Sequence, residues 1–239
     1  MSRVRLYFPP QKIKEYVSIQ EKEILHKIKE VLRLNEGRPL FIFDGQGREY
    51  LYTLTEIRKE SVEIRKIKLV REEPKPTTRI ILAFPLMREA KLDLIFQKCT
   101  ELGIFKFLPF FAQRSIVRTP PSQAKLLRWR KIVEEAVRQS NQLWFPEVEE
   151  VRDFEAVIKE KADLKVAAHP KGDLLFEMFK GGRYSQILII IGPEGDFSHQ
   201  ELEKLKEHNF LFFRLSPNIL RSETSAIFSV GLINYLSLL

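Results

Sequence analysis

Two polar stretches near the end of the chain decide its fold: Gly192-Pro193-Glu194-Gly195-Asp196-Phe197-Ser198 and Leu215-Ser216-Pro217-Asn218-Ile219-Leu220-Arg221-Ser222-Glu223-Thr224. Each follows a short apolar run of strand length, residues 187–191 and 211–215, and each leads into a helical pattern. In an open α/β sheet, ligands bind at the loops that follow the carboxyl ends of the strands. The two stretches therefore predict one pocket, although each could also be only a tight turn.

The charges of the loop residues restrict the kind of ligand that the predicted pocket can bind. Glu194 and Asp196 would repel a phosphate group, and the sequence contains neither G-x-G-x-x-G nor G-x-x-x-x-G-K. A ligand with hydroxyl groups and a positive centre fits these residues better than a nucleotide phosphate does.

The two stretches resemble the signature of the RsmE family of SPOUT methyltransferases, which is written GPEGG-F-S and L-G-x-x-I-L-R-x-E-T-A. Three further segments, residues 26–34, 97–103 and 113–115, look like other motifs of that family and occur in the same order. The resemblance is specific because five separate motifs cover nearly the whole chain.

The resemblance implies an α/β fold: a SPOUT domain with a parallel sheet and a C-terminal trefoil knot, preceded by a small PUA-like β-barrel. It implies S-adenosylmethionine as cofactor, methylation of uracil N3 in 16S ribosomal RNA of the small ribosomal subunit, and a homodimer. The two loops would hold the cofactor through Ile191, Gly192, Pro193, Glu194, Gly195, Leu215, Ser216, Ile219 and Leu220. No metal is required.

The implied reaction needs an acid–base group and a stabiliser of negative charge. Uracil N3 carries an imide proton that must leave, and the resulting charge spreads onto O2 and O4. Arginine can stabilise that charge and a carboxylate or histidine can take the proton. The candidates are Arg114, Arg221 and Glu223, with Glu194 behind them, and His169 as an alternative base. Equally, Glu223 could cap the last helix and Arg221 could pair structurally with a carboxylate.

Positive charge points to a polyanionic partner. Lys and Arg total 40 and Asp and Glu total 32, so 40 − 32 gives +8. We expect RNA contacts from Arg3, Arg5 and Arg33 in the N-terminal part and from Arg138. The alternative is that these residues only form a solvated surface.

Segment composition predicts two domains. Residues 1–72 contain short alternating strands around one helix opened by a capping box at Ser18, and their changed phase after Ile64 predicts a β-bulge. Residues 73–78 hold two prolines and form the predicted linker, and residues 79–239 alternate strands with helices, which favours a parallel sheet. Cys99 is expected in the core. The N-terminus lacks the apolar core of a signal peptide, so the expected location is the cytoplasm.

Three positions depart from the family pattern. Asp196 and Ser216 stand where glycine is usual, and Gln142 stands where arginine is usual, for which Arg138 is a substitute one turn away. These departures leave two alternatives open: a SPOUT methyltransferase that acts on a different RNA nucleotide, and a non-catalytic RNA-binding protein on the same scaffold. The target nucleotide cannot be read from the sequence.

Overall fold

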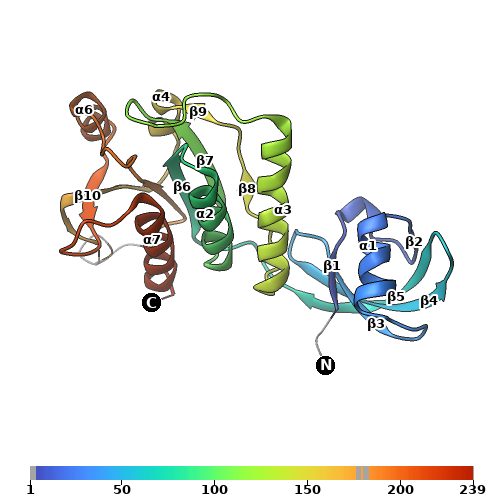
Figure 1. The fold of residues 1–239 in the computed structure, drawn as a ribbon. Helices are drawn as coiled ribbons and strands as arrows, with labels where there is room; N and C mark the ends of the chain where they lie inside the picture. Colours follow the sequence, from blue (N-terminus) through green and yellow to red (C-terminus); the bar gives the residue numbers. More distant parts are fainter. Residues whose placement is uncertain (1–3, 176–178, 180–182, 239) are drawn as a thin grey trace. The chain divides into compact units, whose positions relative to one another are not determined.

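The computed structural model of the protein describes residues 4–175, 179 and 183–238, and these form two compact units (Figure 1). The first unit extends to Lys75 and also contains Asn141–Phe145. The second contains Pro76–Ser140 and Pro146–Leu239. Each unit has its own sheet and its own apolar core. No helix among the described residues is long and apolar enough to span a membrane.

The first unit is built on a five-stranded sheet in the order β1-β3-β4-β5-β2. Its strands are β1 (Arg5–Tyr7), β2 (Tyr16–Ile19), β3 (Pro39–Phe43), β4 (Arg48–Ile57) and β5 (Val62–Glu72), with a 3-10 turn η1 (Pro10–Lys12) after β1. The predicted bulge is confirmed, because Lys66 and Lys68 pair with neighbouring residues of β4 and Ile67 between them is left unpaired.

The predicted start of the first helix is wrong. Ser18 lies in β2, opposite Glu63 of β5, and its hydroxyl donates a hydrogen bond of 2.6 Å to the Glu63 carboxylate. The helix begins later, as α1 (Lys22–His26) continued by a π-helical turn η2 (Lys27–Val31). Ile19 is fully buried in the core of the unit. Pairing with β5 therefore decides the conformation of Ser18 over its local capping preference.

The second unit contains a seven-stranded sheet in which all pairings are parallel. Its order is β12-β10-β11-β6-β7-β8, and β9 also pairs with β7. The strands are β6 (Arg79–Pro85), β7 (Lys106–Phe111), β8 (Glu147–Val148), β9 (Arg152–Asp153), β10 (Leu164–Leu174), β11 (Gln186–Ile190) and β12 (Leu211–Arg214). The predicted parallel sheet is thus confirmed, while the short strands β8 and β9 were not anticipated.

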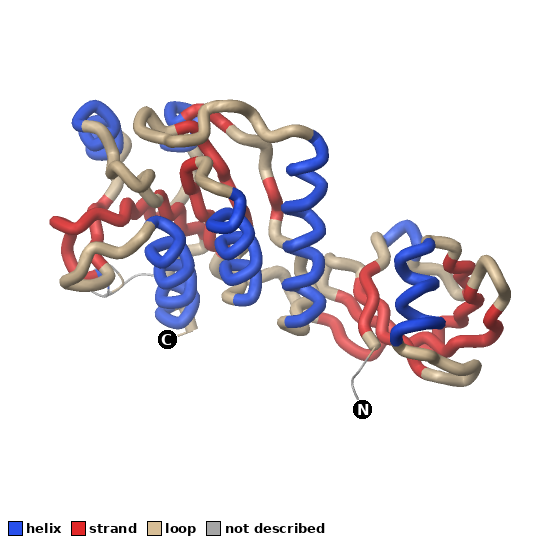
Figure 2. Tube along the Cα trace, viewed as in Figure 1, coloured by secondary structure: helices blue, strands red, loops and turns tan. Residues whose placement is uncertain are grey.

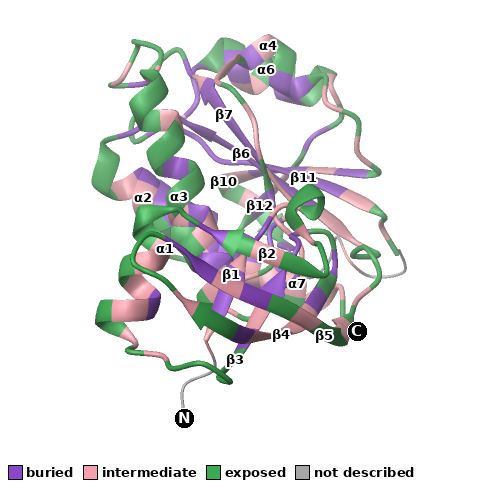
Figure 3. Cartoon of the chain, turned by 90° about the vertical axis from the view of Figure 1, so that its right-hand side faces the viewer, coloured by how far each residue is buried: buried purple, intermediate pink, exposed green. Residues whose placement is uncertain are grey.

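Helices cover both faces of this sheet. On one face, α2 (Glu89–Glu101) packs between α3 (Gln123–Gln139) and α7 (Ser222–Leu236) (Figures 1 and 2). On the other face lie α4 (Phe154–Ile158) and α6 (His199–Glu207), whose apolar residues share a core with β6, β7 and β11. The central strands are therefore buried along nearly their whole length, as Figure 3 shows for β6 and β7.

The chain crosses the sheet near its end. β12 is the outermost strand beyond β10, whereas α7 packs against α2 and β6. Residues 215–221 therefore lead back past the carboxyl ends of β10 and β11. The buried Ser222 hydroxyl then donates a 2.9 Å hydrogen bond to the carbonyl of Gly192 in the loop after β11. This crossing is where a trefoil knot is expected.

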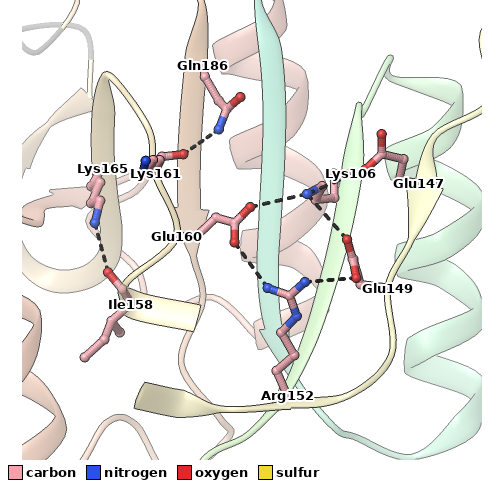
Figure 4. Close-up of polar contacts among 9 residues, drawn as sticks. All are labelled: Lys106, Glu147, Glu149, Arg152, Ile158, Glu160, Lys161, Lys165 and Gln186. Atoms are coloured by element: carbon pink, nitrogen blue, oxygen red, sulfur yellow. Dashed lines mark hydrogen bonds and ion pairs between the residues drawn. The ribbon is translucent and has the colours of Figure 1, made fainter. Parts of the chain in front are cut away.

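A charge network closes the side of the sheet around Lys106 (Figure 4). The Lys106 ammonium lies 3.5 Å from Glu147, 3.4 Å from Glu149 and 3.3 Å from Glu160. Arg152 pairs with Glu149 at 3.0 Å and with Glu160 at 3.2 Å. These contacts join β7, β8, β9 and the turn after α4.

Candidate active site

The two loops that were predicted to share a pocket do line one cavity, of about 750 Å³. One loop follows β11 and the other follows β12, so both lie at the carboxyl ends of the two parallel strands that flank β10. The end of β10 adds a third wall, and the first turns of α2 and α7 add a fourth. The lining residues from the two loops are Ile191, Gly192, Pro193, Glu194, Asp196, Leu215, Ser216, Asn218, Ile219, Leu220 and Arg221.

Eight of the nine residues expected to hold the cofactor line this cavity, and Gly195 does not. Gly195 has no left-handed backbone, and a methyl group added there would lie 3.7 Å from the Arg114 side chain. Gly192 is more restricted, because an added methyl group would lie 3.1 Å from the Phe197 ring. The tight position in this loop is therefore Gly192.

Both departures from the glycine pattern are accommodated by local backbone bonds. Asp196 has φ of 60°, a left-handed conformation that aspartate tolerates better than most residues, and its Oδ1 accepts 2.8 Å from the Phe197 N–H. Ser216 is not left-handed, and its hydroxyl accepts 3.0 Å from the Asn218 N–H.

Arg114 holds the loop rather than facing the cavity. Its guanidinium donates to the carbonyl of Gly195 at 2.9 Å and to that of Phe197 at 3.4 Å. Glu201 supports the same junction from α6, because its carboxylate accepts 2.8 Å hydrogen bonds from the N–H groups of Gln113 and Ser198. Ser198 and Glu201 form the predicted capping box, which is confirmed. The hydrogen bonds of Arg114 and Glu201 therefore fix the conformation of the loop after β11.

A charged group occupies one rim of the cavity. Lys91, from the first turn of α2, places its ammonium 2.6 Å from Glu194 and 3.1 Å from Glu223. The hydrogen bond to Glu194 raises the pKa of Lys91, against the opposing effect of its burial. The same bond, with the nearby charges of Arg88 and Arg221, lowers the pKa of Glu194. Three separate elements therefore meet at one ammonium group.

Arg221 and Glu223 occupy different positions at this rim. Arg221 is the N-cap residue of α7, is exposed and lines the cavity. Glu223 is buried in the first turn of the same helix and faces Lys91. The geometry brings Arg221, Glu194 and Glu223 together and leaves Arg114 behind the loop.

Sequence reasoning missed Arg88 and Lys91, although a signal was present. Both lie just after β6, which pairs directly with β11, so their helix begins at the same edge of the sheet as the two loops.

His169, at the end of the regular part of β10, also lines the cavity. Its Nε2 lies 3.7 Å from Asp196, and its Nδ1 accepts a hydrogen bond of 3.2 Å from the Lys171 N–H. Among the described residues no cluster of three or more metal-ligating side chains occurs.

The residues expected to contact RNA are scattered. Arg3 lies outside the described residues. Arg5 is buried, with its Nε 2.6 Å from Glu49, its guanidinium bonded to the Gln142 carbonyl and its plane over the Phe43 ring. It is therefore a core residue of the first unit, which corrects the expectation of an RNA contact. Arg33 is exposed, and Arg138 is largely covered beside Glu135.

Comparison with known proteins identifies the type of domain. A family model described as an RNA methyltransferase domain matches residues 73–234, and one described as an RNA methyltransferase PUA domain matches residues 20–67. The chain is 32% identical to ribosomal RNA small subunit methyltransferase E of Bacillus subtilis, over 98% of this chain and 96% of the relative. It is 31% identical to the protein of the same name from Rickettsia conorii, over 89% and 86%.

Solved structures agree with this assignment. The crystal structure of a ribosomal RNA small subunit methyltransferase E from Neisseria gonorrhoeae bound to S-adenosyl methionine superposes with a TM-score of 0.86, at 25% identity and 98% coverage of both chains. A methyltransferase from Legionella pneumophila shares the fold with a TM-score of 0.88 at 24% identity, again over 98% of each chain. The chain therefore belongs to the RNA methyltransferase family that includes the ribosomal RNA small subunit methyltransferases E.

Proposed function

We propose that this protein transfers the methyl group of S-adenosylmethionine to a uracil N3 of small-subunit ribosomal RNA. The observation that carries the proposal is the cavity that joins the loops after β11 and β12 in a chain of the RNA methyltransferase family. The relatives' shared name supports the substrate class, and the Neisseria gonorrhoeae structure supports the cofactor.

The cavity suits this cofactor in size and chemistry. Its volume of about 750 Å³ lies in the range of small-molecule sites. Ile191, Leu215 and Leu220 offer apolar walls for a purine ring, while Glu194 and Asp196 offer carboxylates that favour a cationic ligand. When bound, the cofactor would supply an already activated methyl group on a sulfonium. We propose that the cofactor is held by the eight expected residues that line the cavity. Gly195 does not line it, and its carbonyl instead accepts a hydrogen bond from Arg114.

The protein's own task is then to remove a proton and to stabilise an anion. Arg221 is proposed to face the uracil oxygens, since its guanidinium is exposed at the rim of the cavity. Glu223 and Glu194 are the proposed proton acceptors, since their carboxylates lie 3.1 and 2.6 Å from the Lys91 ammonium at the rim of the cavity, and the hydrogen bond from Lys91 lowers the pKa of Glu194. Arg114 is proposed as a positioning residue that holds the carbonyls of the loop.

RNA binding and self-association complete the proposal. Arg33 and Arg138 remain proposed RNA contacts. The exposed aromatic side chains of α7 support a homodimer, because a partner subunit would cover them. Phe228 is 47% exposed and Tyr235 is 61% exposed. Sedimentation of the full chain measures this directly, and a monomer at micromolar concentration would contradict it.

Methyl transfer from labelled S-adenosylmethionine to unmodified small-subunit RNA tests the proposed function. We expect label in the RNA, recovered as 3-methyluridine after nuclease digestion. Label recovered on another base would instead indicate a methyltransferase of different target specificity. Cofactor binding by calorimetry without any label transfer would support the non-catalytic RNA-binding alternative.

A further inference from the structure

A second hollow lies in the first unit. It has a volume of about 270 Å³ and is formed by the turn η1, the strand β2 and the start of α1. Phe8 and Val17 make its apolar floor, and Phe8 is only 3% exposed. The polar lining residues are Gln11, Lys12, Lys14, Tyr16, Ser18 and Glu21.

Tyr16 stands at the wall of this hollow with its ring in solvent. Tyr16 is 63% exposed, which is more than any other tyrosine in the described part of the chain. Its partner across the sheet is Arg65 of β5, directly opposite in an antiparallel pair, so both side chains lie on one face of the sheet. A bare aromatic ring at a concave surface is available for stacking.

Two cations beside the ring are available for a ligand. Lys14 and Arg65 are exposed, and within the described part of the chain neither side chain has a hydrogen bond or ion pair. Two nearby carboxylates are already engaged, because Glu21 pairs with Lys12 at 2.5 Å and Glu63 accepts from Ser18 at 2.6 Å. The other arginines at the ends of this sheet differ, since Arg48 pairs with Glu72 at 2.8 Å and Arg58 with Glu56 at 2.8 Å.

We propose that this hollow, together with the adjoining Arg65, binds a nucleotide of single-stranded RNA. We name it the Tyr16 cleft and define it by the lining residues Phe8, Lys14, Tyr16 and Val17 and by Arg65, which lies opposite Tyr16 on β5. One base stacks on the Tyr16 ring, and the adjoining phosphates pair with Lys14 and Arg65. Stacking on an aromatic side chain together with unpaired cations is the chemistry that retains single strands without reading their sequence. The inference rests on the proposed function for the identity of the polymer as RNA, and it moves the expected contact surface from Arg5 to the Tyr16 cleft.

Fluorescence anisotropy of a labelled single-stranded RNA, titrated with the full chain, tests the Tyr16 cleft. Tyr16→Ala should weaken binding by about tenfold or more, whereas Tyr16→Phe should bind as the parent does because the ring is kept. Lys14→Gln and Arg65→Gln should each lower the slope of log K against log salt concentration by about 0.7, as the loss of one phosphate contact to a single strand predicts. Arg48→Gln is the matched control of equal charge change, and its affinity should stay within about twofold because Glu72 already neutralises Arg48.

The result separates the cleft from the proposed function. Equal RNA affinity of Tyr16→Ala and the parent, with a parental melting curve, would overturn the Tyr16 cleft even if methyl transfer occurs. Calorimetry with S-adenosylmethionine on the same preparations reports on the second unit alone. A parent that fails to bind or use the cofactor would sink the proposed function but leave the anisotropy result standing. A uniform loss for Arg48→Gln as large as for Lys14→Gln would also contradict the cleft, since it would show general charge attraction.

Discussion

Gly192 and Gly195 lie in one loop but meet different surroundings. A methyl group at Gly192 would press on the Phe197 ring at 3.1 Å, and the carbonyl of this residue holds the Ser222 hydroxyl. A methyl group at Gly195 meets only ordinary contacts at 3.7 Å. We predict that Gly192→Ala destabilises the protein by about 1–3 kcal/mol and weakens cofactor binding, because Phe197 must shift. Gly195→Ala should melt and bind like the parent in the same calorimetric assay, and equal behaviour of the two variants would refute this view of the loop.

Lys91 is the residue on which the rim of the cavity depends. Without its ammonium, the buried Glu223 carboxylate would lose its ion pair at 3.1 Å, and Glu194 would lose its partner as well. We predict that Lys91→Met lowers stability by about 1–3 kcal/mol at neutral pH. Lys91→Arg should retain most of the stability, since it keeps the charge.

The pH dependence of the stability lost in Lys91→Met follows from the pKa shifts of Glu194 and Lys91. The lowered pKa of Glu194 gives a contribution that is present above its ordinary value and disappears as the pH falls through the lowered pKa. The raised pKa of Lys91 gives a contribution that is present below its ordinary value and is lost as the pH rises through the raised pKa. The difference in melting temperature between Lys91→Met and the parent should therefore be full at neutral pH and shrink in acid. A difference that grows in acid would contradict the assignment.

Arg221 has an exposed guanidinium at the same rim, which makes its role testable by a conservative change. Lysine keeps the charge but loses the planar fork that can hold two acceptors. If Arg221 stabilises the uracil anion, Arg221→Lys should lower the single-turnover methylation rate by about a hundredfold with little change in cofactor affinity or melting temperature. A defect confined to RNA affinity would assign Arg221 to a phosphate contact, and an earlier melt with an unchanged rate would assign it to the fold.

At the scale of elements, Lys106 connects strands that share few other contacts. β8 and β9 are each two residues long, and the ammonium of Lys106 holds three carboxylates from β8, its continuation and the turn after α4 (Figure 4). Burial works against the charge of Lys106, but the hydrogen bond to Glu160 and the three carboxylates together raise its pKa. This contribution to stability is therefore present at neutral pH and is lost only as the pH rises through the raised pKa.

We predict that Lys106→Met destabilises the second unit by about 1–3 kcal/mol, because Glu147, Glu149 and Glu160 lose the cation they share and Arg152 is left as the partner of Glu149 and Glu160. Lys206→Met on α6 is the control, since Lys206 forms only an exposed pair with Glu203 and should change stability by less than about 0.5 kcal/mol. Urea denaturation of both variants measures the two free energies. Similar losses would show that the network around Lys106 is no more than surface pairing.

At the scale of the whole molecule, the chain passes through the first unit twice. Asn141–Phe145 belongs to that unit, although the residues on either side belong to the second. Leu143 is fully buried, and the Phe145 ring meets Tyr7 edge-to-face at 4.5 Å and stacks with Phe43 at 5.8 Å between ring centroids. Trp144 adds a 3.0 Å hydrogen bond to the Pro74 carbonyl. The first unit is therefore not a simple N-terminal segment that can be cut away.

Removal of residues 1–75 should consequently expose Leu143 and Phe145. We predict that the remaining chain aggregates or melts earlier than the full protein, because two apolar side chains lose their cover. Replacing both with serine in the shortened chain should restore a soluble species that still binds S-adenosylmethionine. Light scattering and calorimetry measure the two properties, and a shortened chain that is soluble without the replacements would contradict the prediction.

Much of the second unit follows from the sequence alone. Apolar runs such as residues 187–191 specify buried strands, since a fully covered parallel strand needs apolar residues on both faces. Ser198 and Glu201 specify the start of α6 through bonds that span only three residues. Loops after strands specify the cavity, because parallel strands bring their carboxyl ends to one edge. Each of these features depends on short-range chemistry or on a general rule of topology.

Other features were decided only by the tertiary structure. Ser18 carries a capping signal but pairs as a strand residue of β2. The sequence suggests that Arg5 is a surface cation, but its side chain is buried and paired with Glu49. The carbonyl of Gln142 accepts a hydrogen bond from Arg5, although the two residues are far apart in the sequence. Lys91, Glu194 and Glu223 come from three parts of the chain, and no local pattern relates them. The physical reason is common to all: burial and ion pairing depend on which segments meet in space, and that meeting is set by long-range packing, against which local preferences of about 1 kcal/mol are weak.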